Sequence, residues 1–199
     1  MLKLPDVTLI CLTNRDFEGH KKAIDKSCEG INFGAVKLIW DEKCSSIDEW
    51  NRKIIYELHN YVQTEFALLI HADGYVINPE SWREEFLSYD YIGAPWPLPQ
   101  DSVSYLDSQG NLVRVGNSVS IRSKKLIDLA ASIPEHRFWA IKDRYGNSNE
   151  DGFICCHYRN WLEDKGCKFA PLELSVHFSK EHEIEENKDI DKTFCFHSI

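Results

Sequence analysis

Asp73 is an acidic residue at the carboxyl end of a predicted strand, where a carboxylate could contact a bound ligand. It follows the apolar run Phe66-Ala-Leu-Leu-Ile70 and precedes Gly74. Ligands of open α/β sheets bind at the carboxyl ends of the strands, and a carboxylate there can hold a hard divalent cation against a diphosphate. An Asp-Gly hairpin turn joining 66–71 to 75–77 explains the same residues without a function. The pattern leaves both interpretations open.

A second acidic position, Glu150-Asp151, is expected to open a helix. Asp151 shares a helical stripe with Ile154, Cys155, Tyr158 and Leu162, which should pack on the sheet, whereas Glu150 is rotated about 100° away. A carboxylate at a helix N-terminus stays ionised, because the dipole and the free N–H groups favour its charge. An ionised Asp151 could accept a proton from a bound hydroxyl. A capping box with Ser148 is the structural alternative.

Three weaker signals accompany these carboxylates. Gly116-Asn117 precedes an alternating strand and lets backbone approach a ligand closely, although it lacks the pattern of a phosphate-binding P-loop. His71 lies two residues before Asp73 and so points to the same face of the strand; a packed histidine is its plainer explanation. His197 lies near the end of the chain, where a frayed tail is the default. The flanking Phe194 and Phe196 argue that this end is tied into the core.

The elements that must position these residues follow from hydrophobic periodicity. Continuous apolar runs predict three strands, at 7–13, 35–40 and 66–70, and helical spacing predicts helices at 17–28 and 47–62. This alternation is typical of a parallel sheet with helices on its faces. The second half is less regular: we expect helices at 79–87, 123–132 and 150–165, a hairpin tip at 109–111, and strands at 91–97, 168–169, 176–178 and 193–196.

Composition limits the classes of protein to consider. The 199 residues include 23 Lys and Arg against 32 Asp and Glu, giving a net charge of −9, which argues against nucleic-acid and anionic-membrane partners. No apolar run approaches the roughly 20 residues that span a bilayer, and no secretory leader is recognisable. Seven cysteines without a C-x-x-C pair favour buried free thiols. We therefore expect one soluble, cytoplasmic domain over 1–199.

Several ordered segments together resemble the GT-A class of glycosyltransferases, and more closely a family of small, largely uncharacterised bacterial and viral proteins of that class. The resemblance runs from about Val7 to His197. Its segments are Ala72-Asp-Gly-Tyr-Val-Ile-Asn-Pro-Glu-Ser-Trp82, Phe86, Tyr89-Asp-Tyr-Ile-Gly-Ala-Pro-Trp96, Val115-Gly-Asn117, Arg122-Ser123, Glu150-Asp151, Ala170-Pro171, Phe178-Ser179, Glu181 and Phe196-His197.

This resemblance implies a fold and a set of roles. It implies an α/β fold, a single GT-A-type (Rossmann-like) domain with a mixed central sheet flanked by helices, a nucleotide-binding half at about 1–95 and an acceptor-side half at about 96–199. Asp73 and His197 would bind Mn²⁺ or Mg²⁺, and Asp151 would be the general base with Glu150 as its neighbour. Trp96 would offer a sugar-stacking surface on the acceptor side. The donor would contact Thr13, Asn14, Arg15, Arg52, His71, Ala72, Gly116 and Asn117.

Two departures from the family pattern are visible. The usual Asp-x-Asp metal motif is reduced to His71-Ala-Asp73, with one carboxylate instead of two. Relatives commonly carry Gly-Asn-Gly-Gly-Phe-Ser where this chain has the shorter Gly116-Asn-Ser-Val-Ser120. The departures bear on metal affinity and on the geometry of the acceptor-side loop, and they leave the resemblance to GT-A glycosyltransferases unchanged.

The implied activity is a hexosyl transfer from a nucleotide diphosphate donor, expected to be a UDP-sugar, to a hydroxyl of a glycan or glycolipid, with inversion at the anomeric carbon. Other glycosyltransferase domains are conceivable partners. A metal-dependent nucleotidyltransferase or phosphohydrolase is one alternative, although such sites gather several carboxylates around two metals. A non-catalytic carbohydrate-binding module is another, supported by six Trp and eight Tyr.

Overall fold

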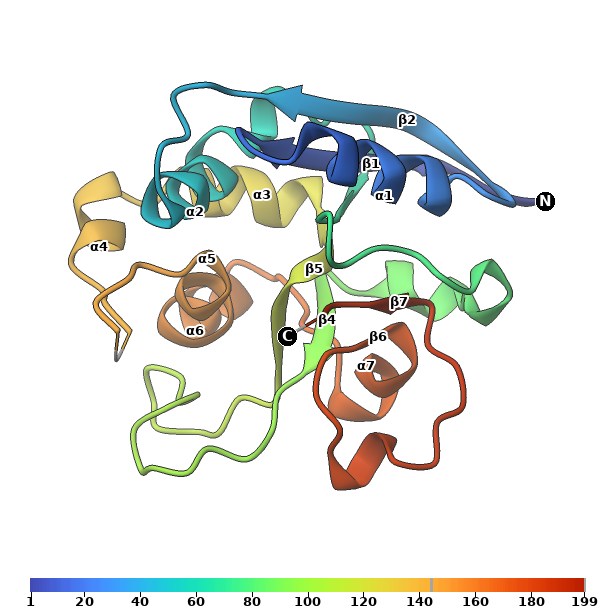
Figure 1. Cartoon of the computed structure of the whole chain (residues 1–199). Coiled ribbons are helices and arrows are strands. Elements are labelled where there is room, and N and C mark those ends of the chain that lie inside the picture. Colours follow the sequence, from blue (N-terminus) through green and yellow to red (C-terminus); the bar gives the residue numbers. More distant parts are fainter. Residues whose placement is uncertain (144, 199) are drawn as a thin grey trace.

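A computed structural model describes residues 1–143 and 145–198 and has a mixed α/β architecture (Figure 1). Its central sheet has five strands in the order β2-β1-β3-β5-β4. The three strands of the first half are mutually parallel, and the other two run antiparallel to their neighbours. The strands are β1 (Leu2–Thr13), β2 (Ile31–Trp40), β3 (Phe66–Leu69), β4 (Tyr91–Pro95) and β5 (Val115–Ser123), and a separate pair consists of β6 (Ser179–Lys180) and β7 (Cys195–Phe196).

Helices cover both faces of the sheet because successive strand residues point to opposite sides. Leu9 and Cys11 of β1 pack in one core with α1, whereas Ile10 and Leu12 pack in another with α2 and α3. A third core joins β4 to the helices that follow Glu150. The helices are α1 (Phe17–Ser27), α2 (Ile47–Tyr56), α3 (Lys124–Ala131), α4 (Glu135–Trp139), α5 (Glu150–Gly152), α6 (Arg159–Asp164) and α7 (Leu172–Phe178).

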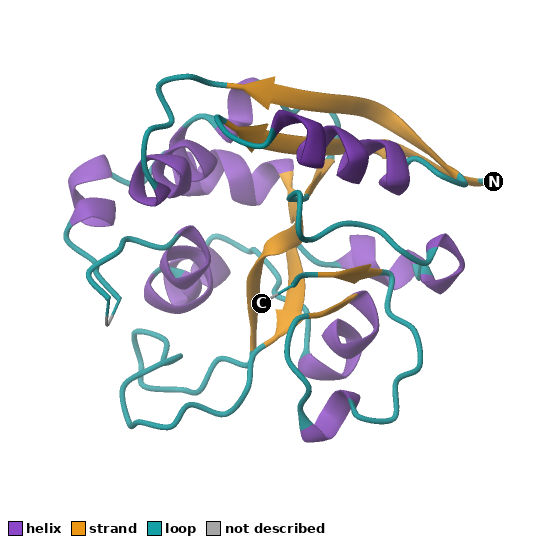
Figure 2. Cartoon of the chain, viewed as in Figure 1, coloured by secondary structure: helices purple, strands orange, loops and turns teal. Residues whose placement is uncertain are grey.

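The predicted strands and helices of the first half are confirmed, with the helix at 47–62 ending in the short 3-10 turn Leu58–Asn60. Helix 123–132 corresponds to α3, and the expected strand at 91–97 corresponds to β4. The hairpin tip at 109–111 is also confirmed, since Leu106 and Leu112 bridge across it and Gly110 has a positive φ of 84°. It lies in the long loop between β4 and β5, drawn in teal in Figure 2.

Three predicted elements are wrong in detail. Residues 176–178 belong to α7, because Pro171 allows a helix to begin there and packing against β4 overrides the alternating pattern. The helix at 79–87 is two short 3-10 turns, Pro79–Ser81 and Glu84–Ser88. The continuous helix at 150–165 is divided into α5, the π-helical segment Phe153–His157 and α6.

The C-terminal segment is tied into the core, as its aromatic residues predicted. Phe194 donates its backbone N–H to His177 and accepts from Ile77, and Phe196 donates to Tyr75. Residues 75–77 therefore pair with this segment, so the hairpin joining 66–71 to 75–77 is wrong. Only a local His71–Gly74 bridge remains of it.

Two further features concern the cysteines and the length of the helices. All seven cysteines are free, and six of them are buried, Cys28 being partly exposed. None of the helices in the described ranges has the length and apolar character needed to cross a bilayer.

The Phe194 ring anchors this segment, because it is fully buried against Trp82, Phe86 and Phe178. We predict that Phe194→Ala lowers the free energy of unfolding by about 3–5 kcal/mol, the usual cost of deleting a core aromatic ring. Urea denaturation of the full chain measures the change. Leu98→Ala is the control, since Leu98 is 63% exposed and should change stability by less than about 0.5 kcal/mol. Equal effects of the two substitutions would contradict this account of the core.

Candidate functional site

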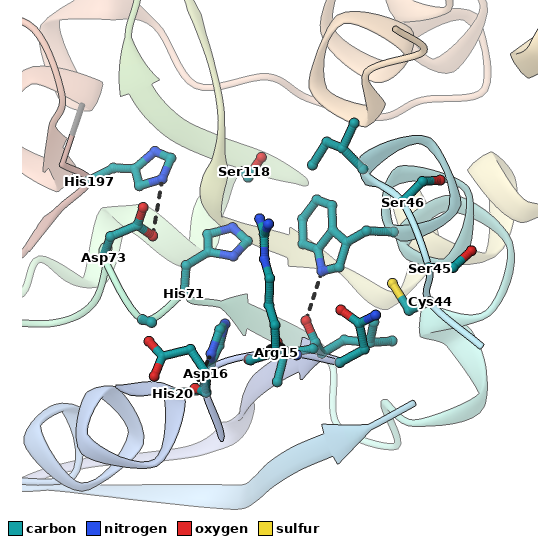
Figure 3. A pocket seen from close by; sticks show the side chains of 16 residues that line it. Arg15, Asp16, His20, Cys44, Ser45, Ser46, His71, Asp73, Ser118 and His197 are labelled. Carbon is teal, nitrogen blue, oxygen red and sulfur yellow. Dashed lines mark hydrogen bonds and ion pairs between the residues drawn. The ribbon is translucent and has the colours of Figure 1, made fainter. Parts of the chain in front are cut away.

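A cavity of about 540 Å³ opens at the carboxyl ends of β1 and β3 (Figure 3). It brings together seven residues predicted for the donor or the metal: Thr13, Asn14, Arg15, His71, Ala72, Asp73 and His197. Ser118, which the sequence offered beside Asn117 as a hydrogen-bond donor, also lines the cavity. No role was predicted for the other lining residues, which are Leu12, Asp16, His20, Cys44, Ser45, Ser46, Ile47 and Trp50. Most of these follow β2 or begin α1 and α2, so their proximity depends on the order of the strands.

Arg15 brings a cationic side chain to this cavity. The chain bends directly after β1, where the Thr13 hydroxyl donates to the Arg15 carbonyl at 2.6 Å and accepts the Arg15 N–H at 3.1 Å. Asp16 continues the bend with a φ of 47° and caps α1 by accepting the Gly19 N–H. The salt bridges found within the described ranges do not include Arg15. Its exposed guanidinium is thus available to an anionic ligand.

Asp73 and His197 lie side by side, although 124 positions separate them in the sequence. The tight turn from His71 to Gly74 presents Asp73, and the Asp73 carbonyl accepts the backbone N–H of Ser198 at 2.7 Å. His197 Nε2 lies 3.7 Å from Asp73 Oδ1. The structure therefore joins the two groups that the resemblance assigned to a metal ion.

The donor set fits a divalent cation that is held only partly by protein. One carboxylate and one imidazole face the same space, and the described residues contain no group of three or more His, Cys, Asp or Glu suited to hold a metal ion alone. Mg²⁺ characteristically keeps several waters and takes one or two carboxylates together with substrate phosphates. A carboxylate and an imidazole beside a cavity that Arg15 also lines are compatible with that mode of binding.

His71 is both packed and part of the cavity wall. Its ring lies 5.0 Å from the Trp50 ring and 5.5 Å from the His197 ring. Burial, followed by the charge of His197, lowers the pKa of His71 well below its usual value, so its imidazole is neutral. Its Nε2 atom is buried without a hydrogen-bond partner among the described residues. A neutral ring with a free polar atom can contact a bound ligand without adding charge.

Glu150 and Asp151 differ from their predicted orientations. Glu150 is fully buried, and its Oε1 accepts a hydrogen bond from Arg122 Nη2 at 2.9 Å, whereas Asp151 is only partly buried. The expectation that Asp151 is the one aimed into the domain is wrong, because a single α-turn and a π-helical segment replace the regular helix. The capping box is also wrong: the Ser148 hydroxyl donates to the Phe138 and Ile141 carbonyls.

The sequence predicted that a helix dipole keeps Asp151 ionised. This prediction is wrong, because the pKa of Asp151 is raised. Burial, followed by the nearby charge of Glu150, raises the pKa of Asp151 to about 7, while the Gly152 N–H opposes the shift. Asp151 does not line the cavity. Its charge nevertheless contributes to raising the pKa of His197, after the larger effect of Glu181, so the two groups interact. A carboxyl group that titrates near neutral pH is suited to proton transfer.

Four predicted donor or acceptor contacts do not line the cavity, namely Arg52, Trp96, Gly116 and Asn117. Arg52 pairs with Glu135 and Glu57 and does not line it. Trp96 is 6% exposed, so its ring offers no open sugar-stacking surface. Tyr105 stacks on Trp96 at 4.7 Å, and Gly116 packs so closely that a Cβ there would lie 1.9 Å from the indole. The glycine is thus required by Trp96, not by a ligand.

Asn117 does not line the cavity but contacts His197, which does. It adopts a positive φ of 89°, which is uncommon for a residue other than glycine and frequent where function imposes strain. Its side-chain Nδ2 lies 3.1 Å from His197 Nδ1. Sequence analysis assigned no role to Glu181, whose Oε1 lies 3.3 Å from the same Nδ1 atom. No local signal marks Glu181, because it follows a strand of only two residues.

The raised pKa of Asp151 predicts a pH-dependent stability. Between about pH 4 and pH 7 the folded protein keeps a proton that the unfolded chain has released, so stability falls as the pH rises. Asp151→Asn removes this loss and keeps an oxygen for the Gly152 N–H. We predict that the variant is more stable than the native chain above pH 7, and that its advantage declines steadily as the pH falls to about 4.

Asp107→Asn supplies a control of opposite sign. Burial opposes ionisation there, but the Asn111 side chain and the backbone N–H groups of Asn111 and Gln109 lower the pKa of Asp107 to about 2. That variant should be less stable than the native chain at pH 7 and should approach it in acid. Urea denaturation across the pH range measures both curves. An Asp151→Asn effect that does not depend on pH would contradict the account.

Comparisons with known proteins give a fold and a family. A search of curated proteins finds no match. A solved structure, a glycosyltransferase involved in the glycosylation of the major capsid of PBCV-1, superimposes with a TM-score of 0.57 at 12% sequence identity, over 96% of this chain and 91% of that chain. That similarity shows a glycosyltransferase-like fold. The family model described as "Protein of unknown function (DUF5672)" matches residues 38–197, which is most of the chain. The chain belongs to the DUF5672 family.

Proposed function

We propose that this chain is a glycosyltransferase of the GT-A type that transfers a sugar from a nucleotide diphosphate donor, a UDP-sugar, to a hydroxyl of a glycan or glycolipid. One observation carries the proposal: Arg15, Asp73 and His197 converge on one cavity at the carboxyl ends of β1 and β3. The glycosyltransferase-like fold supports it. In open α/β sheets this edge is where ligands bind.

The charges around the cavity suit an anionic donor. The chain as a whole carries a net charge of −9, which opposes binding of a diphosphate. Locally, the guanidinium of Arg15 is exposed. Burial opposes the charged form of His197, but Glu181, Asp73 and Asp151 together raise its pKa. The Arg15 guanidinium would contact the phosphates. The nucleoside would lie toward the loop 44–47 and Trp50, whose indole N–H is fixed by the Leu12 carbonyl at 2.7 Å.

Asp73 and His197 are the residues that would hold Mn²⁺ or Mg²⁺. Their side chains lie 3.7 Å apart, and the Asp73 side chain is 65% exposed. A divalent cation bound there would offset the charge that develops on the departing diphosphate.

Asp151 would act as the general base. Above its raised pKa it is ionised and can accept the proton of the acceptor hydroxyl while that oxygen bonds to the anomeric carbon. The bond between the anomeric carbon and the diphosphate breaks, and its electrons leave with the diphosphate. Attack from the opposite face predicts inversion. Glu150 is turned into the core, where its carboxylate pairs with Arg122.

Release of the nucleotide diphosphate tests the proposed reaction. The full chain is incubated with Mn²⁺ and a panel of nucleotide sugars, and slow donor hydrolysis is followed by product detection. We expect one UDP-sugar to release UDP, and Asp151→Asn to reduce the rate by about 10²–10⁴-fold, the contribution typical of a general base. Asp107→Asn, distant from the cavity lining, should keep the native rate at neutral pH.

The same assay separates the other functions. Attack on free nucleotides, with no preference for a sugar donor, would indicate a phosphohydrolase. Sugar binding without release of any nucleotide would indicate a binding module. A folded Asp151→Asn variant with the native rate would remove Asp151 from the mechanism.

Asp73→Ala tests the metal-binding role directly. We predict that the variant loses the Mn²⁺-dependent part of UDP binding, because it removes the carboxylate that faces His197. Isothermal titration with and without Mn²⁺ measures this part. Asp25→Ala is the matched control, since Asp25 lies on the surface of α1 and pairs with Lys21. An unchanged affinity in Asp73→Ala would exclude Asp73 as a metal ligand.

A further inference from the structure

Glu181 lies beside His197 because the backbone aligns them. β6 and β7 pair in parallel, with Ser179 opposite Cys195 and Lys180 opposite Phe196. The next residue on each strand is Glu181 or His197, and the His197 N–H donates to the Lys180 carbonyl at 3.0 Å. Glu181 and His197 therefore occupy equivalent register positions of the two strands, and their side chains project from the same face of the sheet. Their contact follows from strand register and does not depend on a flexible surface loop.

The imidazole of His197 has a different neighbour on each side. Nε2 faces the Asp73 carboxylate, and Nδ1 faces Glu181 Oε1 at 3.3 Å. The His71 ring stacks on it with an interplanar angle of 28°. Both Glu181 and His197 are mostly buried, with side chains 16% and 19% exposed. Water therefore has little access to the contact between them.

Two groups compete for Nδ1, and they favour opposite positions of the ring proton. The Asn117 amide is oriented by its Oδ1, which accepts the Val119 N–H at 2.8 Å, so that its Nδ2 donor points to His197 Nδ1 at 3.1 Å. That donor alone would favour a bare Nδ1 and a proton on Nε2. The Glu181 carboxylate lies 3.3 Å from Nδ1, and although burial opposes its charge, His197 and Asn117 lower its pKa. With the carboxylate present, Asn117 can donate to it and Nδ1 can keep its proton.

We propose that Glu181 is a positioning residue that keeps the proton of His197 on Nδ1, so that Nε2 presents its lone pair to the cation beside Asp73. This inference rests on the proposed function. The neutral ring binds the cation directly; if His197 is doubly protonated, binding releases the Nε2 proton to solvent, and in both cases Nδ1–H stays toward Glu181. A carboxylate behind a histidine ligand fixes the ring and raises its basicity in metal sites generally.

Removing the carboxylate should reverse the tautomer. In Glu181→Ala, Asn117 Nδ2 becomes the remaining polar partner of Nδ1, and Asp73 remains beside Nε2. Both neighbours then favour the proton on Nε2. The ring nitrogen needed by the ligand would carry a hydrogen, and binding would have to displace it.

Long-range ¹H–¹⁵N NMR spectra of the histidine rings measure the tautomer in the ligand-free protein. They are recorded above the pKa of His197, where the ring is neutral, and His197→Gln assigns the signal. We expect the Nδ1–H form in the native chain and the Nε2–H form in Glu181→Ala. Mn²⁺ titration of the same samples should give an affinity about 10- to 100-fold weaker in Glu181→Ala.

Two further variants separate positioning from a general structural effect. Glu181→Gln keeps a neutral acceptor for Nδ1–H, so it should retain the native tautomer and give an intermediate Mn²⁺ affinity. Glu183→Gln changes a neighbouring glutamate that is 76% exposed and pairs with Lys180. It should leave both measurements unchanged. Circular dichroism confirms that each variant is folded.

The inference is overturned if folded Glu181→Ala keeps the Nδ1–H form, or if its tautomer changes while the Mn²⁺ affinity does not. Should Glu181→Ala fail to fold, an Nε2–H form in native protein or in Glu181→Gln overturns it equally. A native chain that binds no Mn²⁺ would refute the proposed metal role. The tautomer of the native chain would then still decide whether Glu181 orients His197.

Discussion

The C-terminal segment holds the candidate site together, because it pairs with two different parts of the backbone at once. Phe196 and Ser198 donate hydrogen bonds to Tyr75 and Asp73 on one side, and His197 donates to Lys180 on the other. These few main-chain hydrogen bonds define how the C-terminal segment aligns with its two neighbouring segments. They place a residue from the end of the chain against a turn that follows β3. The fully buried ring of Phe194 anchors this segment in the hydrophobic core.

Electrostatic balance around this segment determines what the cavity can bind. Acidic residues outnumber basic ones, yet two buried or mostly buried glutamates outside the cavity lining have partners of their own: Glu150 is paired with Arg122, and Glu181 lies against His197. Asp73 remains exposed, and Arg15 is exposed as well. An acidic protein can thus offer a local site for an anion and a cation together. The partly buried Asp151 is set apart, with a pKa near neutrality that suits a base.

Much of the fold and part of the site follow from local patterns. Continuous apolar runs fixed the positions of β1, β2 and β3, and these strands place Arg15 and Asp73 at one edge of the sheet. Aromatic residues around Cys195 correctly indicated an anchored C-terminus. These successes share a cause: burial imposes a periodicity that a sequence displays directly.

The misassigned residues depend on contacts between distant segments. Trp96 looked available for a sugar, but Tyr105 and Gly116 cover its ring. Arg52 is held by Glu135, which lies 83 positions away. Glu181 could not be identified, since its partner is set by the register of two strands of two residues each. The orientation of Glu150 required knowledge of a buried arginine and a π-helical segment.

The central claim is that the cavity beside β1 and β3 binds the diphosphate of a nucleotide sugar. The most direct measurement is a crystal structure of the full chain with UDP and Mn²⁺. We predict a diphosphate that contacts Arg15, with the cation bridging it to Asp73 and His197. A nucleotide bound elsewhere on the molecule, or bound in this cavity without contact to any of these three side chains, would contradict the account.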